Sequence, residues 1–198
     1  MKKLICLVLA ALLCVGAVAM AETGVPSKST ADMAVINEVK SETGVEVKPD
    51  FVLAPVSTTK ATAEQTKTVE TQIAEIAAAG TVESYFGALE DEKGAGVDLK
   101  AVLGTDKPVV NEVMPLVVEN YDSTYGSMKA SFTFSTPYKQ DEPVVIVIRI
   151  VDPVTGKVKQ VALMGKGNGV DGGIDVEFPA EVLEAIQGGN ATMAVVSK

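Results

Sequence analysis

Beyond Pro108, apolar residues recur with a period of two, and this pattern constrains the fold more than any other feature of the chain. Residues 128–134 alternate between apolar and polar side chains, which is typical of a strand with one buried face. Residues 144–151 are apolar on both faces except at Arg149, which predicts a central strand. Two successive segments of this kind indicate a β-rich region.

Turn residues divide the rest of this region into further short strands. They are expected at residues 112–119, 157–164, 174–178 and 191–196. Pro115 limits the first of them to an edge position, because proline cannot donate to a ladder. A short helix that begins at Pro179 and ends at Gly188 is expected to cross between the last two strands. Residues 109–198 are therefore predicted to form an all-β, immunoglobulin-like antiparallel sandwich with a short crossover helix.

The arrangement of these strands resembles that of the immunoglobulin-like and fibronectin-like modules of bacterial surface proteins. The likeness covers residues 109–198 and rests on strand spacing, with no specific motif behind it. It departs from true immunoglobulin domains, because the region contains neither a cysteine pair nor a tryptophan. The resemblance implies an architecture and no particular activity.

Residues 31–108 are predicted to form a small α+β region with amphipathic helices. Apolar residues at three-residue steps favour a short helix over residues 32–40. Residues 45–56 are extended in character and contain two prolines, which favours an edge or irregular strand.

The clearest helix of this region begins at Thr62. Thr62 and Gln65 have the spacing of a capping box, and Gly80 stands where a left-handed residue ends a helix. Shorter helical segments are expected at residues 81–87 and 97–103, on either side of a loop.

Residues 1–21 have the organisation of a signal peptide. A basic start at Lys2 and Lys3 precedes a continuous apolar stretch, and a small-x-small pattern ends at Ala21. We expect cleavage near Ala21, an exposed leader over residues 22–30, and a secreted or cell-surface location. Lipidation of Cys14 and retention of the segment as a membrane anchor are open alternatives. Against lipidation, Leu13 stands where a lipoprotein signal has a small residue.

The residue types that are missing exclude several kinds of chemistry. The chain has no histidine, and both cysteines precede the expected cleavage site. Nucleophilic triads, cysteine proteases, haem sites and zinc sites with imidazole or thiolate ligands therefore lack their essential groups. We expect a non-catalytic binding or structural module with no cofactor. The alternative is an exported hydrolase that uses a pair of Asp or Glu carboxylates.

The charge of the chain limits its partners. Acidic side chains number 26 against 17 basic ones, for a formal net charge of −9, and Arg149 is the only arginine. Repulsion acts against binding nucleic acid or an anionic membrane surface. The expected partner is an unidentified protein or cell-surface ligand.

Three tyrosines are candidate ligand contacts. Tyr121, Tyr125 and Tyr138 fall in two expected loops that flank one strand. Tyrosines gathered on loops are typical of binding surfaces. The alternative is that they pack over the rim of the core with their hydroxyls in water.

Asp171, Asp175 and Glu177 are the one local acidic cluster that we consider as a metal site. The alternative for Asp175 and Glu177 is the solvent face of a strand, because they alternate with apolar residues. The glycine-rich residues 165–173 lack the Gly-Lys-Ser/Thr ending of a phosphate-binding loop and are expected to form a flexible turn.

Overall fold

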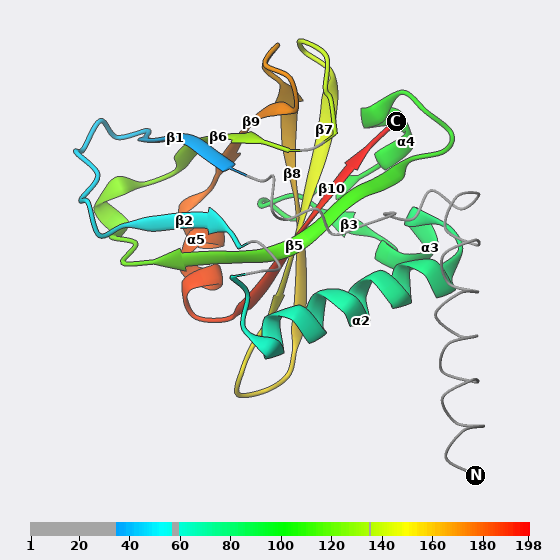
Figure 1. Ribbon diagram of the computed structural model, residues 1–198, viewed down its shortest axis with the longest axis horizontal. Coiled ribbons are helices and arrows are strands. Elements are labelled where there is room, and N and C mark those ends of the chain that lie inside the picture. The colour runs from blue at the N-terminus through cyan, green and yellow to red at the C-terminus, as the bar shows by residue number, and fades with distance from the viewer. Residues whose placement is uncertain (1–34, 57–59, 135) are drawn as a thin grey trace.

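A computed structural model describes residues 35–56, 60–134 and 136–198 of the chain (Figure 1). The expected signal peptide and leader lie outside the described residues. Most of the described chain belongs to eight strands. They are β1 (Val35–Ser41), β2 (Val52–Pro55), β5 (Val109–Glu119), β6 (Met128–Thr133), β7 (Pro143–Val151), β8 (Val158–Gly167), β9 (Gly173–Phe178) and β10 (Asn190–Ser197).

The eight strands form one antiparallel sheet in the order β1-β6-β9-β8-β7-β10-β5-β2. The sheet is curled, because its edge strands β1 and β2 lie side by side (Figure 1). The prediction of a mostly antiparallel β structure is confirmed. Each pair of neighbours in this order is hydrogen-bonded, from β1 to β2, so these eight strands form one continuous curled sheet.

The larger hydrophobic core lies inside the curl and receives side chains from both halves of the sheet. Phe132 is fully buried at its centre, with ring centroids 5.7 Å from Phe134 and 6.0 Å from Phe178. Burial of a phenylalanine contributes about 1.5–3 kcal/mol. Helix α5 (Ala180–Gln187) closes this core with its apolar face. It has the predicted place between β9 and β10, so that expectation is confirmed.

A second core lies on the outer face of β5, β7 and β10, beneath three helices. They are α2 (Ala63–Ala79), α3 (Val82–Phe86) and α4 (Leu99–Leu103). This core contains no residue of β6 or β9. The helices thus cover one half of the outer face, as Figure 1 shows on its right-hand side.

The signals that predicted α2 are present in its structure. Thr62 and Gln65 form the capping box, with both reciprocal hydrogen bonds at 3.2 and 2.9 Å. Gly80 ends the helix in the left-handed conformation. The helix is therefore specified locally at both ends.

The prediction of a short helix over residues 32–40 is wrong, because residues 35–41 form strand β1 and pair with β6. The pairing register shifts between Ile36 and Glu38. A bulge of this kind inserts an extra residue and interrupts the two-residue period. The remaining apolar spacing resembles a helical stripe, which explains the error.

The predicted edge position of β5 is also wrong, because this strand lies between β10 and β2. Pro115 is tolerated because of where β2 ends. Its carbonyl accepts a hydrogen bond from the Val56 N–H at 2.9 Å, one residue beyond β2. In an antiparallel ladder, the backbone N and O of one residue point toward the same neighbouring strand. The N–H that Pro115 lacks would therefore point toward the end of β2, so no hydrogen bond to β10 is lost.

The expected boundary near Pro108 falls between α4 and β5. Strands from both sides of this point share the sheet, because β1 pairs with β6 and β2 pairs with β5. The expected loop after α3 contains a small hairpin, β3 (Leu89–Glu90) and β4 (Gly96–Val97). This hairpin projects over the sheet beside β8 and shapes the site described next.

Candidate functional site

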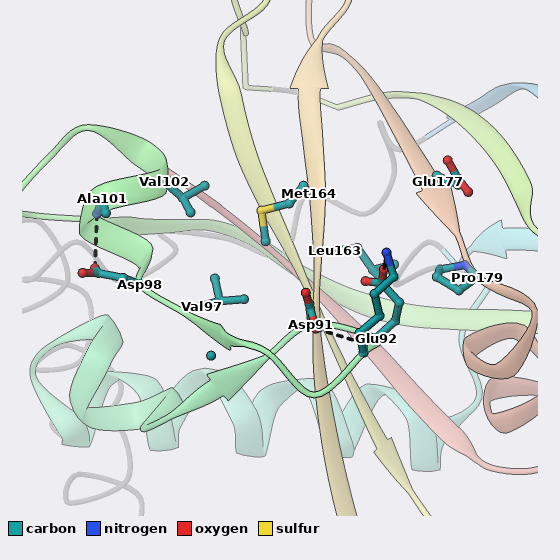
Figure 2. A pocket seen from close by; sticks show the side chains of 12 residues that line it. Asp91, Glu92, Val97, Asp98, Ala101, Val102, Leu163, Met164, Glu177 and Pro179 are labelled. Atoms are coloured by element: carbon teal, nitrogen blue, oxygen red, sulfur yellow. Dashed lines mark hydrogen bonds and ion pairs between the residues drawn. The ribbon is translucent and has the colours of Figure 1, made fainter.

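A hollow of the described surface lies between the β3–β4 hairpin, α4 and the outer side of β8 and β9 (Figure 2). Its volume is about 510 Å³. Hollows of roughly 300–1,000 Å³ are the size that takes small ligands or single side chains of a partner. We call this hollow the acidic hollow, for reasons that its lining makes clear.

Aspartates hold the wall of the acidic hollow in shape. The Asp91 Oδ1 accepts hydrogen bonds from the Lys93 and Ala95 N–H groups at 2.9 and 2.8 Å, which closes the hairpin turn. Asp98 caps α4 by accepting from the Lys100 and Ala101 N–H groups at 3.0 and 3.2 Å. These backbone contacts are the ones that Asx turns and helix caps use.

The floor of the acidic hollow is apolar and its rim is charged. The floor consists of Val97, Val102, Leu163, Met164 and Pro179, and the rim carries Asp91, Glu92, Asp98, Glu177 and Lys93. The Lys93 Nζ lies 3.5 Å from the Glu92 Oε1, so the one cation of the rim already has a carboxylate partner. Figure 2 shows the Met164 thioether between Val102 and Leu163, in the middle of the floor.

A second hollow of about 460 Å³ adjoins the first and shares Met164 and Glu177 with it. It lies on β6, β8 and β9, over the half of the outer face that none of the described helices covers. Its charged residues are Lys40, Lys129, Lys166, Asp175 and Glu177. Together the two hollows form one groove, which we call the outer groove. Met164, which is 45 % exposed, lies where they meet.

Charges in the second hollow are arranged in cross-strand pairs. Lys129 lies opposite Glu177, and Asp175 lies opposite Lys166. The Lys129 Nζ also contacts the Glu42 carboxylate at 3.0 Å, and this hydrogen bond raises the pKa of Lys129. Opposite charges on facing residues stabilise a sheet and leave little net charge. The excess negative charge of the groove is therefore concentrated at the acidic hollow.

Tyr121 and Tyr125 lie in the core near the loop between β5 and β6. Their side chains are 8 % and 1 % exposed, and both rings contact Phe51, at centroid distances of 6.3 and 5.7 Å. The Tyr121 hydroxyl donates to the Gly126 carbonyl at 2.6 Å. The Tyr125 hydroxyl accepts from the Lys48 N–H at 3.1 Å. Both tyrosines pack as core residues with hydroxyls bonded to the protein.

Tyr138 is also buried, at 5 % exposed, and packs edge-on against Phe134. Its hydroxyl accepts a hydrogen bond from the Asn111 Nδ2 at 3.2 Å, and burial raises the pKa of Tyr138 far above its usual range. Within the described chain, the Tyr138 ring does not contact the rings of the other two tyrosines. The structure does not gather the three on one surface, and we do not include them in the site.

The three acidic residues considered as a metal site are not brought together. Asp175 and Glu177 share the outer face of β9, and Asp171 lies in the turn before it. The Asp175 Oδ1 accepts from the Ser131 hydroxyl at 2.7 Å and from the Asn168 Nδ2 at 2.9 Å. Within the described ranges, no three His, Cys, Asp or Glu side chains converge as a metal-ligand set.

Sequence reasoning missed the residues that shape the outer groove. Asp91 and Asp98 fall in segments interpreted as a loop and a helical turn, and the hollow that they line together with β8 is a tertiary feature. Met164 offered a signal, since it is an apolar residue on the polar face of an alternating strand. A large exposed apolar side chain amid polar neighbours is typical of a contact surface.

No helix among the described residues combines the length and apolar character needed to span a bilayer. The comparisons of the chain with family models, with curated proteins and with solved structures found no match.

Proposed function

We propose that the protein is an exported, non-catalytic binding module whose acidic hollow takes a lysine or arginine side chain of a partner protein. The observation that carries this proposal is the combination of an apolar floor with four carboxylates on the rim. A lysine or arginine has an aliphatic stem and a cationic head, so it matches both parts of such a site. The net charge of −9 adds a long-range attraction for a basic partner.

The roles of the aspartates support binding over catalysis. Asp91 and Asp98 use their Oδ1 atoms for backbone hydrogen bonds that hold the hairpin and α4. Carboxylates held in this way suit a rigid binding site, in which the charges are fixed in place before a partner arrives. Met164 at the junction of the groove supports the same interpretation, because thioethers adapt to the surfaces of binding partners.

The curled sheet would act as the rigid scaffold of this module. Its two halves face each other across one core, as the two sheets of a sandwich do. An immunoglobulin-like arrangement remains part of the proposal on this ground alone. Export remains part of it on the ground of the N-terminal segment.

Titration of the chain beginning at Glu22 with acetylated, amidated tetralysine, followed by fluorescence anisotropy, tests the proposal. We expect saturable binding of tetralysine and none of tetraglutamate. Glu177→Gln should weaken binding about two- to fivefold, as the loss of one exposed charge pair does. Met164→Ser should weaken it by removing apolar contact with the stems.

Glu70→Gln is the matched control, because Glu70 is exposed on α2 and lines neither hollow. Equal weakening by Glu70→Gln and Glu177→Gln would show that only net charge matters and would contradict a specific site. Turnover of peptide or glycan probes with saturation kinetics would favour the paired-carboxylate hydrolase instead. Expression with the full leader, followed by mass spectrometry of the exported chain, tests cleavage before Glu22.

A further inference from the structure

The only arginine of the chain, Arg149, makes no ion pair with a described residue, although Glu64 and Glu75 line the same hollow. Arg149 lies on the central strand β7, opposite Thr192 of β10 and Gln160 of β8. It is half-buried, on the face where Val145 and Val147 of the same strand belong to the second core. In the described part of the chain, its guanidinium makes no ion pair and no hydrogen bond. A cation placed in this way is energetically unfavourable unless a ligand or water pairs with it.

A second donor beside Arg149 also lacks an acceptor. Gln72 of α2 is 1 % exposed, and its Oε1 accepts a hydrogen bond from the Thr192 hydroxyl at 2.5 Å. Its Nε2 is buried and has no hydrogen-bond partner in the described structure. Thr192 faces Arg149 directly across the two strands, so the unpaired amide and the unpaired guanidinium flank the same residue. Native proteins rarely leave a buried donor unpaired without a functional reason.

Both groups line a hollow of about 280 Å³ between α2 and β7. The hollow is separate from the outer groove and shares no lining residue with it. We propose that this hollow is a binding site for a carboxylate, held in a fork by the Arg149 guanidinium and completed by the Gln72 amide. Arginine binds a planar carboxylate through two parallel N–H···O hydrogen bonds, and a third donor fixes the orientation of the anion.

The charges around the site favour a carboxylate over a multiply charged anion. Lys67 adds a second cation at the rim, whereas Glu64 and Glu75 place two carboxylates beside it. The Glu75 Oε2 accepts from the Tyr85 hydroxyl at 3.3 Å. Burial raises the pKa of Tyr85 to about 12, against the opposing effect of Arg149, so this phenol stays neutral and does not compensate the arginine. A singly charged carboxylate suits these surroundings of mixed charge better than a phosphate does.

Nuclear magnetic resonance of the chain beginning at Glu22 offers a direct test. Because Arg149 is the only arginine, its Nε–H gives a single side-chain signal that needs no assignment by mutation. We expect acetyl-alanine to shift this signal and the Gln72 amide signals saturably at millimolar concentration. The uncharged acetyl-alanine amide should shift neither. A titration with acetyl-trialanine separates the sources: tighter binding indicates a peptide C-terminus, and equal binding indicates a small free acid.

Two variants probe the two donors separately. Gln72→Leu should weaken acetyl-alanine binding about tenfold, because one hydrogen bond to a charged group is lost. Arg149→Lys keeps the charge and loses the fork, so it should also weaken binding about tenfold. Lys157→Gln, in the exposed turn between β7 and β8, removes a cation elsewhere and should leave binding unchanged. If Gln72→Leu fails to fold, the loss of acetyl-alanine binding in Arg149→Lys still tests the proposed site.

The assignment has clear contrary results. It is overturned if no probe shifts the Arg149 signal saturably, or if acetyl-alanine and its amide act alike. Inorganic phosphate binding as tightly as acetyl-alanine would overturn the choice of a carboxylate. Equal loss in Lys157→Gln and Arg149→Lys would reduce the effect to net charge and overturn the site.

Discussion

Gly172→Ala should destabilise the fold much more than Gly156→Ala, although the two glycines have nearly the same backbone conformation. Their φ angles are +69° and +68°. A Cβ at Gly156 meets nothing within 4 Å, whereas a Cβ at Gly172 overlaps the Phe134 carbonyl oxygen. The Gly172 carbonyl also accepts the Phe134 N–H at 2.8 Å, so the two segments cannot separate without losing that hydrogen bond.

The expected magnitudes follow from this geometry. An alanine in the left-handed region costs about 1 kcal/mol, and the reduced entropy of the unfolded chain is the same for both variants. The contact with Phe134 adds about 1–3 kcal/mol to Gly172→Ala alone, as overpacking does in cores. The difference between the variants therefore isolates the steric contact.

Urea unfolding followed by far-ultraviolet circular dichroism measures both variants against the parent chain. We expect a lower midpoint and an unchanged slope, with Gly172→Ala the less stable variant. Unfolding free energies of the two variants within about 0.5 kcal/mol of each other would refute the reasoning. That result would mean that the turn before β9 yields to the methyl group and is as flexible as the sequence alone suggests.

Two further predictions concern α2 and the buried tyrosine. Thr62→Ala should lower the free energy of unfolding by about 1 kcal/mol, because the helix cap is lost. Ile76→Ala should lower it by about 2–5 kcal/mol, because Ile76 is only 1 % exposed. Urea midpoints in the reverse order would contradict this ranking. Burial raises the pKa of Tyr138 above its ordinary value of 10.0, so the unfolded phenol ionises first and stability falls as the pH rises beyond about 10. Tyr138→Phe should show a smaller alkaline loss in urea midpoints, and an unchanged loss would exclude Tyr138 as its cause.

The elements with local signals could be predicted from the sequence. Helix α2 has its cap at Thr62 and its end at Gly80, both within the helix's own segment. Helix α5 follows a proline and has three apolar residues on one face. The central position of β7 followed from its two apolar faces. These features are local in sequence, so no pairing partner had to be known.

The features that depend on pairing could not be predicted in the same way. β1 was misread because a bulge interrupts its period, and β5 because Pro115 normally marks an edge. The single curled sheet depends on which strands pair, and spacing does not specify that. The acidic hollow joins residues 91–102 to residues 163–179, and no local pattern reports their contact.

The order of synthesis bears on the position of β10. This strand lies between β5 and β7, so it completes the middle of the sheet, and it is the last of the eight strands in the chain. A ribosome therefore completes seven strands before the strand that links β7 to β5 exists. Until then the sheet stays in two parts, β1-β6-β9-β8-β7 and β5-β2. Closure of the sheet then becomes a single late event that follows delivery of the C-terminal segment.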